Sequence, residues 1–92
     1  MSESLDFIFE RANSALITQD FEYAEGLLTN VLKKHPDMSP NDKEKIESLL
    51  ARIYGDEGDL ERSLAAYLRL YEREPDNVDL MLSLGRIYRH LG

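Results

Sequence analysis

The chain has 92 residues, of which 42% are hydrophobic and 32% are charged, with a formal net charge of −7 and no cysteine. This composition is typical of one small globular domain, and it excludes a disulfide framework, a thiolate metal site and a cysteine nucleophile. The negative charge argues against nonspecific binding to nucleic acid or anionic lipid, because both require a basic surface.

The first two predicted helices occupy the N-terminal part of the chain. Apolar residues at helical spacing predict a first helix that ends near Thr18 and Gln19, with an apolar face made of Phe7, Ile8, Ala12, Ala15 and Leu16. Asp20 is placed to cap a second helix, since its carboxylate can accept a backbone N–H at the helix start. That helix carries Ala24, Leu27, Leu28, Val31 and Leu32. It ends before Pro36, which cannot continue a helix.

Capping residues also mark the third and fourth helices. Ser39 followed by Pro40 predicts a third helix that begins at the proline and continues to a turn at residues 55–58. Its apolar residues are Ile46, Leu49, Leu50, Ile53 and Tyr54. Asp59 is the predicted cap of a fourth helix, which Pro75 ends. The predicted inner face of the fourth helix consists of Leu60, Leu64, Tyr67, Leu68 and Tyr71.

The fifth predicted helix repeats part of the third. Asn77 caps it, it extends from residue 78 to about residue 90, and Gly92 falls where a left-handed C-terminal cap is expected. Within it, Leu-Gly-Arg-Ile-Tyr at 84–88 follows Leu-Ala-Arg-Ile-Tyr at 50–54 at an interval of 34 residues. A fixed period of this size indicates copies of one supersecondary unit. Such arrays usually function through an extended binding surface, so we expect a binding surface rather than a catalytic cleft.

The second copy resembles a tetratricopeptide repeat. Leu50, Ala51 and Tyr54 supply the large, small and aromatic positions of that repeat's first helix. Its turn, second helix and closing proline are matched by Gly58, Asp59, Ser63, Tyr67 and Pro75. Glu47 and Leu70 depart from the pattern, because the family prefers tryptophan and alanine there. The resemblance implies an all-α fold, a right-handed α-solenoid of antiparallel helix-turn-helix repeats.

The same pattern divides the chain, residues 1–92, as a single domain. The predicted parts are repeat 1 at 5–37, an insertion at 38–43, repeat 2 at 44–77 and the first helix of a truncated repeat 3 at 78–92. Repeat 1 matches less closely, because Arg11 and Ala15 replace the expected leucine and aromatic residue. Pro36 and Pro75 are 39 residues apart, which is why five inserted residues are expected between the repeats.

The resemblance further implies a non-catalytic scaffold that binds a peptide or partner protein in a concave groove lined by the first helix of each repeat. The predicted groove positions are Phe9, Asn13, Lys45, Leu49, Arg52, Leu82, Arg86 and Arg89, and neighbouring lining positions include Asp56, Ser83 and His90. Arg52 and Arg86 occupy equivalent positions, so in this acidic chain they favour an acidic ligand segment. The alternative is that both arginines pair only with neighbouring acids such as Asp56 and Asp79.

The fifth helix is apolar on more than one side, whereas a terminal helix of a repeat array should be polar outside. Two explanations remain open. Either the chain is the N-terminal part of a larger repeat protein, or this end docks on a second copy as a structural assembly module. The predicted self-association surface consists of Leu82, Leu84, Ile87, Tyr88 and Leu91.

Enzymatic and metal-dependent functions have no support in the sequence. No glycine-rich phosphate loop or Ser/His/Asp arrangement is recognisable, and His35 and His90 lack companion ligands at metal-binding spacing. We therefore expect no catalytic residue, no metal and no cofactor. The N-terminal residues lack a basic region followed by an apolar run, and no stretch has the length of a membrane span, so we expect a cytoplasmic protein without membrane insertion.

Overall fold

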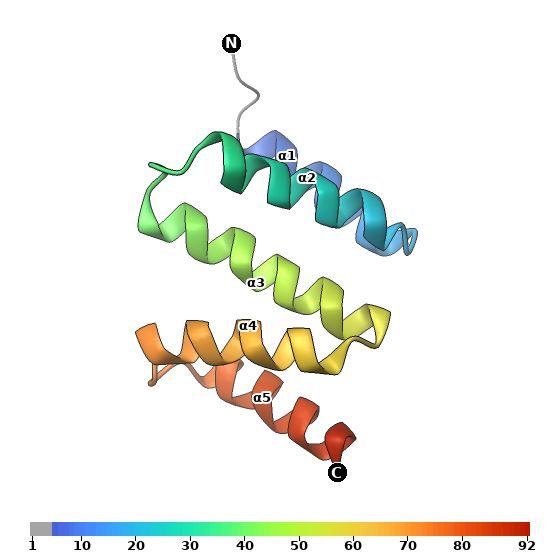
Figure 1. The fold of residues 1–92 in the computed structure, drawn as a ribbon, viewed down its shortest axis with the longest axis vertical. Helices are drawn as coiled ribbons and strands as arrows, with labels where there is room; N and C mark the ends of the chain where they lie inside the picture. The colour runs from blue at the N-terminus through green and yellow to red at the C-terminus, as the bar shows by residue number, and fades with distance from the viewer. Residues whose placement is uncertain (1–4) are drawn as a thin grey trace. The chain divides into compact units, whose positions relative to one another are not determined.

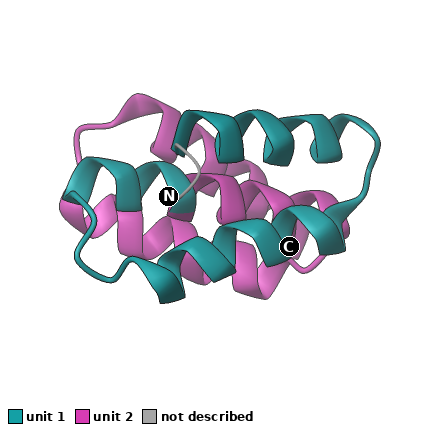
Figure 2. Ribbon diagram, turned by 90° about the horizontal axis from the view of Figure 1, so that it is seen from above, with its two compact units in different colours: residues 1–46 teal, residues 47–92 magenta. Residues whose placement is uncertain are grey.

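The computed structural model describes residues 5–92, which form five helices and no strand (Figure 1). The helices are α1 (Leu5–Ile17), α2 (Phe21–Lys34), α3 (Pro40–Glu57), α4 (Leu60–Arg73) and α5 (Val78–Leu91). They confirm the predicted all-α helical-repeat class. The chain divides into two compact units, residues 1–46 (unit 1) and residues 47–92 (unit 2), so the boundary falls within α3 (Figure 2). The predicted repeat boundaries stay a prediction.

Three of the four predicted N-caps make the expected side-chain hydrogen bond. The Ser39 hydroxyl accepts from the Asp42 N–H at 3.2 Å, the Asp59 carboxylate from the Arg62 N–H at 3.2 Å, and the Asn77 amide oxygen from the Leu80 N–H at 3.3 Å. Each bond satisfies a backbone donor that the helix itself leaves without a partner.

The fourth cap, Asp20, was predicted wrongly in one respect. It occupies the N-cap position of α2, but its side chain accepts no capping hydrogen bond. The carboxylate instead lines a hollow on the surface of unit 1. The turn before it is held by the backbone, because the Asp20 N–H donates to the Ala15 carbonyl at 2.8 Å.

Left-handed residues end the first, third and fifth helices. Gln19 has a φ of 62°, Gly58 a φ of 91° and Gly92 a φ of 97°. Gly92 caps α5 as predicted, with its N–H donating to the Tyr88 carbonyl at 3.1 Å. Helix α3 is longer than predicted, because residues 55–57 continue it and only Gly58 leaves the helical conformation.

The core of unit 1 forms where α1 and α2 pack together. Its buried residues are Ile8, Ala12, Ala15 and Leu16 from α1, Ala24, Leu28 and Val31 from α2, and Ile46 from α3. Phe7 was predicted on this apolar face but is 45% exposed. Its ring lies beside the Arg11 guanidinium, 5.6 Å from the ring centroid, so it packs on a charged neighbour of its own helix.

The core of unit 2 is built from α3, α4 and α5. Its buried residues are Leu50, Ala51, Ile53 and Tyr54 from α3, Ser63, Ala66 and Leu70 from α4, and Leu80, Leu84 and Ile87 from α5. Leu84 and Ile87 were predicted on the self-association surface, and their burial removes them from it.

The predicted inner face of α4 is also wrong. Ser63, Ala66 and Leu70 are its buried residues, while Leu60, Leu64, Tyr67, Leu68 and Tyr71 are half-buried or exposed. The physical reason is a close approach of two helices, because the Ser63 hydroxyl donates to the Ala51 carbonyl of α3 at 2.8 Å. A small side chain allows this contact and a leucine does not. The packing face of α4 was predicted from its larger apolar residues, and that prediction was wrong because the small Ser63 makes the contact with α3.

Candidate binding site in unit 2

Helices α3, α4 and α5 line a hollow of about 520 Å³, the unit 2 hollow. Its lining consists of Ala51, Arg52, Gly55 and Asp56 from α3, Leu60, Ser63 and Tyr67 from α4, and Ser83, Arg86, Ile87 and His90 from α5. Small and apolar side chains are thus combined with two arginines, one carboxylate and one imidazole. Polar side chains outnumber apolar ones in this lining, so the hollow suits a polar or charged group more than an apolar one.

The Ser63 hydroxyl connects α4 to α3 at this lining. Ser63 is fully buried, and its hydroxyl is satisfied by the Ala51 carbonyl at 2.8 Å. Gly55 faces the same hydroxyl, since a β-carbon added at Gly55 would lie 3.2 Å from the Ser63 Oγ. The space beside α3 therefore depends on two very small residues facing each other.

The structure brings Arg52 and Arg86 to one hollow, although 34 residues separate them in the sequence. The Arg52 Nε lies 3.9 Å from the Asp56 carboxylate, and these two side chains are 61% and 48% exposed. An ion pair this long and this exposed contributes about 1 kcal/mol or less. Within residues 5–92 no ion pair is found for Arg86. Asp56 therefore binds Arg52 only weakly. Because two arginines and one carboxylate line the hollow, it carries more positive than negative charge.

The remaining groove residues predicted from the sequence do not line this hollow. Leu49 is half-buried on α3, and Leu82 and Arg89 are exposed on α5. The other three, Phe9, Asn13 and Lys45, belong to unit 1. Phe9 is half-buried, and Asn13 and Lys45 are exposed.

Sequence reasoning missed the contribution of α4. Leu60 and Tyr67 line the hollow, but the sequence analysis placed groove residues only on the first helix of each repeat. The signal that could have found them is the small residue Ser63 between them, which leaves room beside the larger neighbours on α4.

The chemistry available here is anion binding beside an apolar surface. Each guanidinium presents a planar fork of donors that matches a carboxylate. Tyr67, Leu60 and Ile87 supply apolar contact next to that charge. Among residues 5–92 no three His, Cys, Asp or Glu side chains are grouped so as to hold a metal ion, and no helix there is long and apolar enough to cross a membrane.

Paired helices, a duplicated sequence and a hollow lined by three consecutive helices define this chain as an all-α helical-repeat protein. Residues 48–92 match the family model described as tetratricopeptide repeat. This match supports assignment of residues 48–92 to the tetratricopeptide repeat family, as the resemblance of the second repeat predicted. No curated protein and no solved structure matches the chain. Tetratricopeptide repeats are generally non-catalytic protein-interaction modules.

Proposed function

We propose that this chain is a protein-interaction scaffold and that its unit 2 hollow binds an acidic side chain of a peptide or partner protein. The observation that carries the proposal is the presence of Arg52 and Arg86 in one hollow. The family match over residues 48–92 supports the general role, because repeats of this kind generally bind proteins. Phe9, Asn13, Lys45, Leu49, Leu82 and Arg89 stay predicted contributors to binding.

The charges of the unit 2 hollow support an anionic ligand. Two guanidinium groups and one carboxylate, that of Asp56, line it, whereas the chain as a whole carries a formal charge of −7. Arg52 leaves Asp56 at little cost, since their contact is 3.9 Å long and largely exposed to solvent. A carboxylate held by both arginines replaces one loose contact with several charge-assisted hydrogen bonds.

The test is a titration with short synthetic peptides in which one or two glutamates flank a leucine or phenylalanine, measured by isothermal titration calorimetry. Arg52→Gln and Arg86→Gln should each weaken binding about tenfold or more, because each removes hydrogen bonds to a charged group. Arg69→Gln, on the exposed part of α4 and outside the hollow, is the matched control and should bind as the unchanged chain does. Equal losses in all three variants, or no loss in the first two, would reject this site.

A second candidate function is self-association through the outer face of α5. Val78, Met81, Leu82, Tyr88 and Leu91 are large apolar residues that are all exposed on this helix, with Leu82 57% and Tyr88 52% exposed. Large apolar side chains exposed together on one helix favour docking of another protein surface. The candidate surface differs from the predicted one, because Leu84 and Ile87 are buried.

A further inference from the structure

A difference between the two repeats points to a second site, in unit 1. When Pro36 is aligned with Pro75, Ala15 corresponds to Tyr54 and Tyr23 corresponds to Arg62. In unit 2 the Tyr54 side chain is buried, and the Arg62 guanidinium lies 4.1 Å from its ring centroid. Arg62 also donates to the Tyr54 hydroxyl at 3.0 Å. A tyrosine ring therefore occupies the space between α3 and the start of α4.

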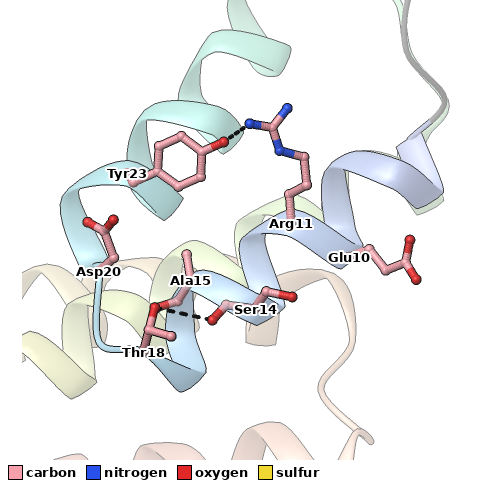
Figure 3. Close-up of a pocket in the computed structure, with 7 residues that line it drawn as sticks. All are labelled: Glu10, Arg11, Ser14, Ala15, Thr18, Asp20 and Tyr23. Carbon is pink, nitrogen blue, oxygen red and sulfur yellow. Dashed lines mark hydrogen bonds between the residues drawn. The ribbon is translucent and has the colours of Figure 1, made fainter.

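Unit 1 has no ring at that position. Its hollow of about 430 Å³, the unit 1 hollow, is lined by Glu10, Arg11, Ser14, Ala15, Thr18, Asp20 and Tyr23 (Figure 3). Ala15 contributes one methyl group where the second repeat contributes a phenol. The unit 1 hollow thus lies beside Ala15, the position that Tyr54 occupies in unit 2.

An arginine and a tyrosine still bridge the two helices of unit 1, but here the arginine is on the first helix and the tyrosine on the second. Arg11 lies on α1 and donates to the hydroxyl of Tyr23 on α2, as Figure 3 shows. The Arg11 guanidinium is 5.5 Å from the Tyr23 ring centroid and 5.6 Å from that of Phe7. This contact keeps a flat cation and an aromatic ring at the edge of the unit 1 hollow, one helical turn before Ala15.

We propose that the unit 1 hollow binds an aromatic side chain of a partner protein, and a tyrosine in preference to a phenylalanine. The inserted ring would lie where the Tyr54 ring lies in unit 2, against the Ala15 methyl group and beside the Tyr23 ring and the Arg11 guanidinium. Aromatic rings and guanidinium groups both attract a further ring.

The preference for tyrosine comes from the polar part of the lining. Asp20 contributes a carboxylate and Ser14 a hydroxyl, so the lining offers groups that accept hydrogen bonds. A phenol O–H can donate to one of them, whereas phenylalanine has no group to donate. The site does not depend on the anion-binding proposal for unit 2, because the two hollows share no residue.

The probe for this site is p-cresol, the side-chain analogue of tyrosine, followed by amide chemical shifts in a ¹⁵N NMR titration. We expect saturable shifts at Ala15, Thr18 and Tyr23 and smaller ones in unit 2, where Tyr54 already fills the equivalent space. Toluene should bind about threefold or more weakly, because it lacks the phenol hydroxyl. Shifts of equal size in both units, or equal binding of toluene, would overturn the proposal.

The decisive variant is Ala15→Tyr, which supplies the ring from the chain itself. It should abolish the p-cresol shifts, while Ala65→Tyr, the same substitution at an exposed position of α4, should leave them unchanged. Undiminished binding to folded Ala15→Tyr would show that the ring does not enter this hollow. If Ala15→Tyr fails to fold, Arg11→Gln tests the same proposal. Loss of the guanidinium should weaken p-cresol binding about twofold to fivefold. Unchanged binding would contradict the proposal.

Discussion

The contact between Gly55 and Ser63 offers a quantitative test of how closely α3 and α4 pack. A β-carbon added at Gly55 would lie 3.2 Å from the Ser63 Oγ and 3.9 Å from the Ser63 Cβ. The first distance is crowded, whereas the second is an ordinary van der Waals contact. We therefore predict that the effect of Gly55→Ala depends on whether the Ser63 hydroxyl is present.

The expected free energies follow from these distances. Gly55 lies within α3 with ordinary helical geometry, so alanine there should stabilise the chain by about 0.5–1 kcal/mol through helix propensity. With Ser63 present, crowding against the hydroxyl should offset most of this gain. Ser63→Ala alone should destabilise by about 1 kcal/mol, because it removes the buried hydrogen bond to the Ala51 carbonyl. In that background Gly55→Ala should show its full gain, which gives a coupling of about 0.5–1 kcal/mol.

The assay is urea unfolding followed by far-UV circular dichroism for the original chain, both single variants and the double variant. Gly85→Ala is the control, because a β-carbon at this exposed position of α5 would meet nothing within 4 Å. It should stabilise equally with and without Ser63. If Gly55→Ala stabilises the chain by the same amount in both backgrounds, the close contact does not govern the packing of these helices.

Two further outcomes concern the turn after α3 and the outer face of α5. Gly58→Ala should destabilise the chain by about 1 kcal/mol in the same urea assay. The cause is the φ of 91° alone, because no atom lies within 4 Å of the added carbon. An unchanged urea midpoint would contradict this prediction. If α5 mediates self-association, sedimentation velocity should show a mass that rises with concentration and falls to the monomer in Leu82→Glu. Ile17→Glu, at an apolar position of α1 that is 83% exposed, should still self-associate. If the unchanged chain is a monomer at every concentration, self-association through α5 is rejected.

The positions of the helices could be predicted from the sequence because their ends are encoded locally. Ser39, Asp59 and Asn77 each mark a helix start through one side chain and one nearby backbone N–H. Gly92 marks an end through its backbone conformation, which a residue without a β-carbon adopts readily. Asp20 is an exception to this rule, because its side chain makes no capping hydrogen bond and lines the unit 1 hollow instead.

The buried faces were harder to predict, because burial depends on what the other helix presents. Leu64 and Leu68 are larger and more apolar than Ser63, yet Ser63 is the residue that faces α3. Periodicity identifies a set of apolar positions, but it does not report that a hydroxyl finds a carbonyl on a neighbouring helix. The pairing of Arg52 and Arg86 at one hollow was within reach of the sequence, since the repeat assigned them equivalent positions.

The comparison of the two repeats shows how one fold acquires two different surfaces. Ala15 and Tyr54 occupy equivalent positions and both are buried, so each satisfies the packing of its own pair of helices. The smaller residue leaves space at the surface, and the polar residues around it then determine which ligand that space accepts. If p-cresol binds beside Ala15, a position normally assigned to packing decides binding, and a search confined to exposed groove residues would overlook it.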